Sequence, residues 1–479
     1  MKNRYITIYM FGLLMVSATI FNGCKKSDLS PTPTTAIDAN DAFTSPGKVE
    51  AAMVGLYNLH ASGRYMNAML LQADIKGEDI FVRESGNYGR FAQAYSYAEI
   101  PTSIQQAFWE AGYQLIANCN QAIQKIPLAP LTDADKKKYL AEARAIRGST
   151  YFNLIRCYGK PYTLDPTAPG VPKSELPLNA DSETLARASV KDIYDFILAD
   201  LNFAEQNMSA SLTKISRLTL PAVQGLLSRV YLSMGDKWVE ASKFAKLART
   251  GHPLDDNATL LNGFYKASGE WIWDMEYTAD NNPGFVGAAS FHEPYDIGYS
   301  TFRADINFHA LFGADDIRKQ QFLISDAGYD DPLLRDEEVE DAGGFLMNKF
   351  YFKDGFDASV VLMRSAEMFL NEAEAEAELG NSGPAQAALF EVQRRSIPGA
   401  VISTNTGDAL KSEIQIERRK ELYGEGFRIF DILRRKETLK RTSTSHWHKV
   451  NMAPGDNKFL MPIPVEEINA NPKITQNPR

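Results

Sequence analysis

Two stretches of the chain, residues 221–250 and 362–395, follow one plan of a helix, a tight turn and a returning helix. Pro221 stands at a helix start, and Gly235 precedes alanines that recur along the returning helix. In the second stretch Gly380 breaks the first helix, and Ala385 and Ala388 lie on the next one. Small residues let paired helices approach closely, and glycine adopts the positive φ that ends a helix. The plan predicts stacked helical hairpins.

Three more segments carry apolar residues at helical spacing, namely residues 103–126, 139–159 and 189–206. Ser189 stands where the first free backbone amides of a helix need a side-chain acceptor. The hairpins resemble the tetratricopeptide repeat, whose period is about 34 residues. We therefore expect a mainly α fold, an α/α superhelix of tetratricopeptide-like helix pairs.

The pattern changes between the two hairpins, from 251 to 357, and also in the loops from 76 to 101. Glycine, proline, asparagine and aromatic residues replace the helical spacing, while Trp271, Trp273 and Met275 alternate as in a strand. This predicts an irregular loop-rich lobe carrying short strands, with both tryptophans in a strand core. Long aromatic-rich loops of compact proteins are usually functional, so we expect a ligand site there.

The composition fits a globular protein, because 44% of the 479 residues are hydrophobic and 11% are aromatic. The formal net charge is −9 at pH 7. An acidic surface repels phosphate backbones and anionic lipid headgroups, so the charge argues against a nucleic-acid-binding protein and against a basic membrane-binding surface.

The N-terminus has the pattern of an export signal. Lys2 and Arg4 precede an apolar run at 6–20, and Gly23 and Cys24 follow shortly after it. A small residue before a cysteine resembles the lipobox of bacterial lipoproteins, which predicts a signal peptide at 1–23, lipidation of Cys24 and a Ser/Thr/Pro-rich tether at 24–40. An ordinary secretory signal with an incidental cysteine is the alternative. Acyl chains contribute about 0.8 kcal/mol per buried methylene, so several chains would anchor the protein.

Two further cysteines, Cys119 and Cys157, lie in the predicted helices. Two thiols do not form a disulfide framework, and a free buried thiol is the more common state in a helix. A bridge between them stays open at this point.

The sequence offers little for catalysis. It contains no Gly-x-Ser-x-Gly elbow, no phosphate-binding glycine loop, no HExxH and no CxxC. His446 and His448 could lie on one side of a strand and bind a metal ion. Without further ligands, however, the better interpretation is that both are ordinary loop residues. The acidic run Glu372, Glu374, Glu376 and Glu378 alternates with alanine and is interpreted as a solvated helix face. We expect no enzyme, no cofactor and no metal.

The most charged stretch is ERRKELYGEGFRIFDILRR, residues 417–435. Acids alternate with bases, which suits ion pairs within a scaffold better than a phosphate groove. This stretch resembles the signature of the SusD/RagB family of Bacteroidetes surface lipoproteins. It matches at Glu417, Arg418, Arg419, Glu421, Leu422, Glu425, Gly426, Arg428, Asp431 and Arg434, with Ile432 in place of leucine. Four other stretches agree, beginning at Arg144, Asp315, Arg364 and Phe459.

The resemblance implies a SusD-like domain at 41–479, with a repeat scaffold at about 103–250 and 358–436. The irregular ligand-binding lobe would comprise about 251–357 and the loops 76–101. Proteins of this family lie on the outer face of the outer membrane and cover a SusC-like TonB-dependent transporter, to which they typically deliver oligosaccharides. They are not catalytic and need no cofactor. No binding residue transfers by motif, because ligand sites of the family lie in variable loops.

Site residues must therefore come from chemistry. Sugars present apolar C–H faces and polar rims, so a capture site needs aromatic rings with a few amide or carboxylate partners. The candidates in the two irregular regions are Asn87, Tyr88, Tyr95, Phe285, Tyr295, Asp296 and Tyr299. Packing in the core is the alternative for each ring. A few stacked rings give affinities in the μM to mM range.

Three functions stay open on the sequence alone. The leading one is a cell-surface glycan-binding lipoprotein that serves a SusC-like transporter. The alternative is a repeat protein that caps a transporter for peptides or other nutrients. A glycoside hydrolase comes third, because the acidic run does not supply the paired carboxylates that such an enzyme needs.

Overall fold

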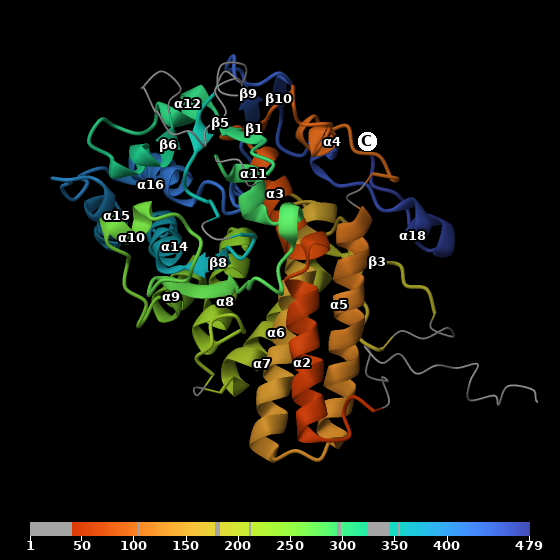
Figure 1. Cartoon of the computed structure of the whole chain (residues 1–479). Helices are drawn as coiled ribbons and strands as arrows, with labels where there is room; N and C mark the ends of the chain where they lie inside the picture. Colours follow the sequence, from red (N-terminus) through yellow and green to blue (C-terminus); the bar gives the residue numbers. More distant parts are fainter. Residues whose placement is uncertain are drawn as a thin grey trace, which may run out of the picture.

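A computed structural model describes residues 41–103, 106–177, 183–209, 212–294, 298–323, 344–352 and 355–479. The predicted signal peptide, Cys24 and the tether lie outside these residues, as do Tyr295 and Asp296. The described chain is mainly helical, with paired helices and short two-stranded sheets, as the sequence predicted (Figure 1). No helix in these ranges is long and apolar enough to cross a membrane.

The long helices form the scaffold. Their bounds are α2 Pro46–His60, α5 Gln106–Lys125, α6 Asp133–Tyr158, α7 Val190–Asn207, α8 Leu220–Met234, α9 Trp238–Ala248, α14 Ser365–Glu378, α15 Ser382–Ser396 and α16 Gly407–Leu422. Consecutive members pack against each other in the pairs α5/α6, α6/α7, α8/α9 and α14/α15, and α14 also packs against α9 and α16. Helices α2, α5, α6 and α7 run side by side at the lower centre of Figure 1.

Local sequence chemistry sets these helix ends. The Ser189 hydroxyl accepts a hydrogen bond from the backbone amide of Asp192 at the start of α7. Thr132 caps α6 in the same way through the amide of Asp135. Gly235 ends α8 with φ +75°, a conformation that glycine adopts without steric cost. The hairpin turn and the N-cap predicted from the sequence are confirmed.

The remaining elements are short. The helices are η2 Gly63–Asn67, α3 Ala68–Ile75, α4 Ala92–Tyr95, η3 Ile126–Leu128, α10 Asn257–Leu261, η4 Gly284–Val286, α11 Ala288–His292, α12 Ile306–His309, η5 Ile317–Gln321, α17 Arg428–Arg434, η6 Asn457–Phe459 and α18 Val465–Ala470. The strands are β1 Ile80–Val82, β2 Pro169–Pro172, β3 Arg187–Ser189, β4 Trp271–Met275, β5 Phe302–Ala304, β6 Phe322–Leu323, β7 Leu346–Met347, β8 Val360–Arg364, β9 Leu439–Arg441 and β10 Val450–Met452. They form the antiparallel pairs β1/β5, β2/β3, β4/β8, β6/β7 and β9/β10.

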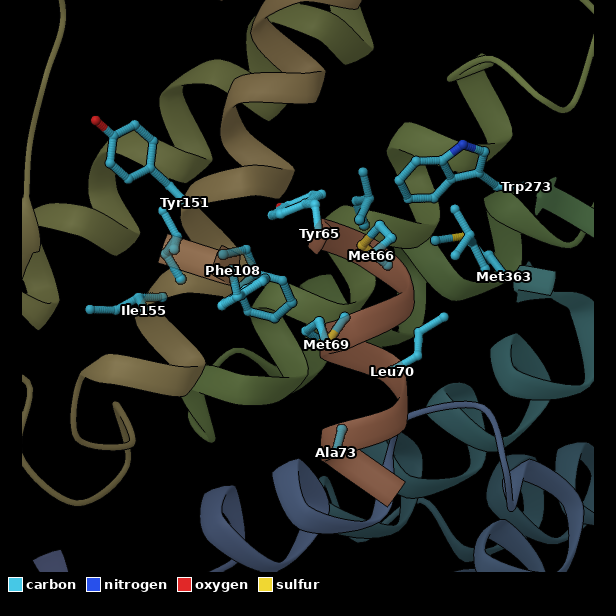
Figure 2. Close-up of a cluster of buried hydrophobic side chains, with 14 of the residues drawn as sticks. Tyr65, Met66, Met69, Leu70, Ala73, Phe108, Tyr151, Ile155, Trp273 and Met363 are labelled. Atoms are coloured by element: carbon cyan, nitrogen blue, oxygen red, sulfur yellow. The ribbon is translucent and has the colours of Figure 1, made fainter. Parts of the chain in front are cut away.

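Strand β4 connects the irregular lobe to the scaffold core. Trp271 and Trp273 are both buried on it, as predicted, and Trp273 pairs with Met363 of β8. Figure 2 shows Trp273 and Met363 in one apolar cluster with Tyr65 and Met66. The core therefore continues from the helical scaffold into the lobe.

The stretch 417–435 is a scaffold of buried ion pairs, as the alternation of charges predicted. Arg364, at the end of β8, donates to Glu270 at 2.8 Å, to Glu421 at 2.5 Å and to Glu425 at 2.7 Å. Arg395 of α15 pairs with Glu421 at 2.5 Å. These side chains are almost fully buried, so each carboxylate needs a neighbouring cation to compensate its charge.

The acidic run at 372–378 corrects one sequence interpretation. Glu372, Glu374 and Glu376 are buried rather than solvated. Arg249 of α9 binds Glu372 at 2.7 Å, and Arg434 of α17 binds Glu374 at 2.6 Å. The run is structural, as proposed, but it faces basic residues of neighbouring helices instead of water.

Cys119, Cys157 and His446 lie in packed parts of the molecule. Cys119 and Cys157 are both free, so they form no disulfide. His446 is buried, and its Nδ1 lies 2.7 Å from the hydroxyl of Tyr95. Among the described residues, no group of three or more His, Cys, Asp or Glu is placed to hold a metal ion.

Candidate functional site

Two small sheets bring distant parts of the irregular lobe together. In β1/β5, Val82 pairs with Phe302, and the amide of Arg83 donates to the carbonyl of Thr301 at 2.9 Å. The segment that follows β1 therefore runs beside the segment that precedes β5. In β4/β8, Met275 pairs with Val360, so the residues after β4 leave from the same end as those before β8.

These connections assemble a row of aromatic rings around one arginine, which we call the aromatic row: Tyr88, Arg90, Tyr299, Phe285 and Phe356. The guanidinium carbon of Arg90 lies 3.8 Å from the centroid of the Tyr299 ring and 5.4 Å from that of Tyr88. Tyr299 and Phe285 have ring centroids 5.4 Å apart, and Phe285 and Phe356 are 4.5 Å apart. The row thus combines cation–π and ring–ring contacts.

The row is open to solvent. Tyr88 is 90% exposed and Phe285 is 48% exposed, while Tyr299 and Phe356 are half-buried. Val286, next to Phe285, is also exposed. Large apolar side chains that stay at the surface next to one another mark binding sites more often than single exposed residues do.

The loop that carries the row contains strained backbone. Tyr88 has φ +52° and Phe91 has φ +56°, a region that bulky side chains rarely adopt. Ser300, next to Tyr299, has φ +47°. Such residues cost about 1–3 kcal/mol each and persist where the surrounding contacts hold them, often at ligand sites. Part of that support comes from Asn87, whose side-chain amide donates to the carbonyl of Arg90.

The rings predicted from the sequence divide into two groups. Tyr88, Phe285 and Tyr299 meet in the aromatic row. Tyr95 is fully buried on α4 and is bonded to His446, and burial raises the pKa of its hydroxyl well above the ordinary value. Asn87 is buried as well and supports the loop from within. Their positions correspond to the packing alternative.

Sequence reasoning missed Arg90 and Phe356. Arg90 stands in a loop rich in tyrosine and phenylalanine, so its potential as a cation–π partner was a usable signal. Phe356 gave no such signal, because it joins the row only through the pairing of β4 with β8.

Comparison with known proteins identifies the fold and the family. Residues 26–232 match a family model described as "Starch-binding associating with outer membrane", and residues 337–479 match the model of the SusD family. The chain belongs to the SusD/RagB family. SusD-like protein P2 of Formosa agariphila is 24% identical over 527 aligned residues, which cover 100% of this chain and 99% of that protein.

Solved SusD structures agree with this membership. The SusD superfamily protein of Bacteroides thetaiotaomicron superposes with a TM-score of 0.82 at 24% identity, covering 91% of this chain and 100% of the other. A SusD-like carbohydrate binding protein of Bacteroides vulgatus gives a TM-score of 0.79 at 25% identity, covering 90% and 98% of the two chains. SusD-family proteins are binding proteins and not enzymes.

Proposed function

We propose that this SusD-family protein is a cell-surface lipoprotein that captures a glycan on the aromatic row and delivers it to a SusC-like TonB-dependent outer-membrane transporter. The exposed row itself is the observation that carries the proposal. A family model described as starch-binding and associated with the outer membrane supports it, and so does the similarity to a carbohydrate binding protein.

The physical argument rests on the faces of the rings. An aromatic ring stacks on the C–H face of a sugar, and a few neighbouring polar groups orient the hydroxyls. Arg90 supplies such donors. Within the described part of the chain its guanidinium makes one hydrogen bond, from Nη1 to the Asn87 carbonyl at 3.1 Å. A small number of stacked rings gives weak capture, which permits release to a transporter.

Binding of glycans by the purified mature protein tests this site. Tyr299→Ala and Phe285→Ala each remove one ring, worth about 0.5–1.5 kcal/mol, so the Kd should rise about 2- to 13-fold. Leu128→Ala is the matched control, because Leu128 is an exposed apolar residue of η3 outside the row. Glycan affinities that are equal in all three variants and the wild type would reject the row as the site.

Membrane attachment and transfer need separate measurements. Lipidation of Cys24 is expected to appear as acyl mass on the N-terminal peptide, and Cys24→Ala should release the protein from the membrane fraction. Copurification of a barrel transporter with the wild-type protein would support delivery. A protein that copurifies with the barrel but binds no member of a broad glycan panel would favour a peptide or other nutrient instead.

A further inference from the structure

A cavity of about 610 Å³ is lined in part by residues 281–283, which directly precede the segment that carries Phe285. It opens between the C-terminal half of α2, strand β4 and the residues after β4, and its lining includes Asn58, His60, Ser62, Arg217, Asp274 and Asn281. No member of the aromatic row lines it. Its volume falls in the range of about 300–1,000 Å³ that is typical of small-molecule sites.

Two buried polar groups of the lining have unused hydrogen-bonding atoms. Asp274 is 4% exposed, and its Oδ1 has no hydrogen-bond partner among the described residues. His60 is 2% exposed, and its Nε2 likewise lacks a partner within that part of the chain. An unpaired buried polar atom costs about 1–3 kcal/mol, a cost that a bound molecule or water can offset by supplying the partner.

Burial makes both groups favour their neutral forms. It raises the pKa of Asp274 to about 7, with a smaller contribution from the nearby Glu276 carboxylate. Burial also lowers the pKa of His60 to about 3, so its imidazole is neutral at physiological pH. A neutral imidazole offers one donor and one acceptor, and a carboxyl that exchanges its proton near neutrality both donates and accepts.

The full charges of the cavity wall are already paired with each other. Lys214 binds Glu276 at 2.9 Å, and Arg217 binds Glu50 at 2.5 Å. Neither an anion nor a cation would therefore find an unpaired opposite charge among these four residues. The ring of Trp273 adds an apolar surface, with its centroid 5.0 Å from that of His60. The wall suits a molecule that is neutral, hydroxylated and apolar on one face.

We propose that this cavity is a second binding site, for a neutral polyhydroxylated molecule the size of a mono- or disaccharide, with the side chains of Asp274 and His60 in its lining. Each sugar hydroxyl both donates and accepts, so it matches groups that do the same. The inference extends the proposed function, because it adds a site that does not need the aromatic row.

Ligand-observed NMR on the purified mature protein tests this second site. The probes are glucose, galactose, mannose, xylose, maltose and cellobiose, with glucuronate and glucosamine as charged comparators. Measuring them on Tyr299→Ala, in which the aromatic row has lost one ring, lowers the share of the binding that the row can contribute. We expect at least one neutral sugar to bind this variant, and to bind it better than either charged comparator.

Two substitutions then locate that signal. Asn58→Trp places a large ring on an exposed position of the cavity lining, and Asp274→Leu removes the buried carboxyl. Each should weaken binding at least about tenfold, which corresponds to about 1.4 kcal/mol. Ala51→Trp is the control, because Ala51 is exposed on the same helix but outside the lining. Asn58→Trp disturbs no buried group, so it remains informative if Asp274→Leu fails to fold.

The two proposals fail on different results. The second site is overturned if no neutral sugar binds Tyr299→Ala, if Asn58→Trp leaves that binding unchanged, or if a charged comparator binds more tightly. Glycan binding that disappears in the row variants alone would overturn the second site and leave the proposed function standing. Binding that survives every row variant but is lost in Asn58→Trp would reject the aromatic row as the glycan site and leave the second site standing.

Discussion

Replacing Arg364 by methionine tests how much of the fold depends on buried charge. The guanidinium is about 1% exposed and holds the carboxylates of Glu270, Glu421 and Glu425, all within 2.8 Å. Methionine fills much of the same volume without a charge or a donor. The three carboxylates would stay in the core with one cation fewer.

The magnitude follows from the cations that remain. Glu421 keeps Arg318 and Arg395, Glu425 keeps Lys349, and Glu270 keeps Arg395 at 3.3 Å. Removing Arg364 breaks three buried ion pairs, but each carboxylate keeps another cation, so we expect a cost of about 3–5 kcal/mol, the range for removing one partner of a buried pair. Domains are commonly stable by only about 5–15 kcal/mol, so the loss in free energy of unfolding is large.

The pH dependence gives a second signature. Arg364 helps to hold the pKa of Glu425 below its ordinary value, although burial alone would raise it. Without Arg364 the carboxylates of Glu421 and Glu425 take up protons more readily, and protonation removes part of the unfavourable charge. The stability that Glu421 and Glu425 contribute to the wild type is present at neutral pH and is lost as the pH falls through their lowered pKa values. The difference between variant and wild type should therefore narrow as the pH falls.

Urea unfolding followed by circular dichroism measures both effects. Arg394→Met is the matched control, because Arg394 is 57% exposed and pairs with Glu391 on the surface of α15. Surface pairs contribute at most about 1 kcal/mol, so the control should unfold close to the wild type. An Arg364→Met protein as stable as Arg394→Met at neutral pH would refute the idea that this network is charged and energetically necessary.

Three further outcomes follow from single positions. Gly225→Ala should lower the free energy of unfolding by about 1–3 kcal/mol, because the added Cβ would lie 2.0 Å from the sulfur of Met363. Gly55→Ala should raise it by about 0.5–1 kcal/mol, because its Cβ meets no atom within 4 Å. Thermal unfolding of the two variants measures both changes. Glu374→Ala should cost about 3–5 kcal/mol in urea unfolding, while a solvated glutamate would cost within about 0.5. The folded-state pKa of Asp274 is about 7, above its ordinary 3.8. The stability of the wild type should therefore fall relative to that of Asp274→Asn as the pH rises towards about 7, by at most about 1.4 kcal/mol per pH unit. A stability difference between the two proteins that does not change with pH would contradict the raised pKa.

Local rules made much of the fold predictable from the sequence. The N-cap at Ser189, the turn at Gly235 and the buried strand at Trp273 each depend on chemistry within a few residues. Helical spacing then defined the hairpins. Tertiary structure did not override these signals, because the apolar face and the capping residues favoured the same element.

The acidic run shows where such reasoning ends. Spacing indicates which glutamates share a side of α14, but it does not show what lies opposite. Glu372 faces Arg249 of α9, and Glu374 faces Arg434 of α17. These cations come from elements 60 or more residues away in sequence. Only the tertiary arrangement distinguishes a solvated acid from a buried one.

The candidate site was predictable in kind and only partly in detail. The aromatic-rich loops predicted rings near a ligand, which stays a prediction; the structure shows that Tyr88 and Tyr299 both contact Arg90. Tyr95 lies only seven positions after Tyr88 and is fully buried. Both tyrosines belong to the same irregular stretch, so no spacing rule separates the exposed ring from the buried one. Strand pairing between distant segments makes that distinction.

The charged stretch at 417–435 connects the scaffold to the rings without contributing a residue to the aromatic row. Arg419 pairs with Asp79, which directly precedes β1, and Arg428 pairs with Glu78 at 2.5 Å. Glu421 and Glu425 hold Arg364 at the end of β8. The strands that position Tyr88, Tyr299 and Phe356 are thus anchored from the same segment.

This arrangement separates the support of the site from its specificity. The residues that match the family signature are the ones that hold β1 and β8 in place, whereas the exposed rings lie in loops beyond the strand ends. An exposed ring can change with little effect on stability, because its removal breaks no buried ion pair. A change in Arg364 or Arg419 would instead disturb a whole strand. We therefore expect the loops to set the ligand preference of the proposed site, and the charged scaffold to hold those loops in shape.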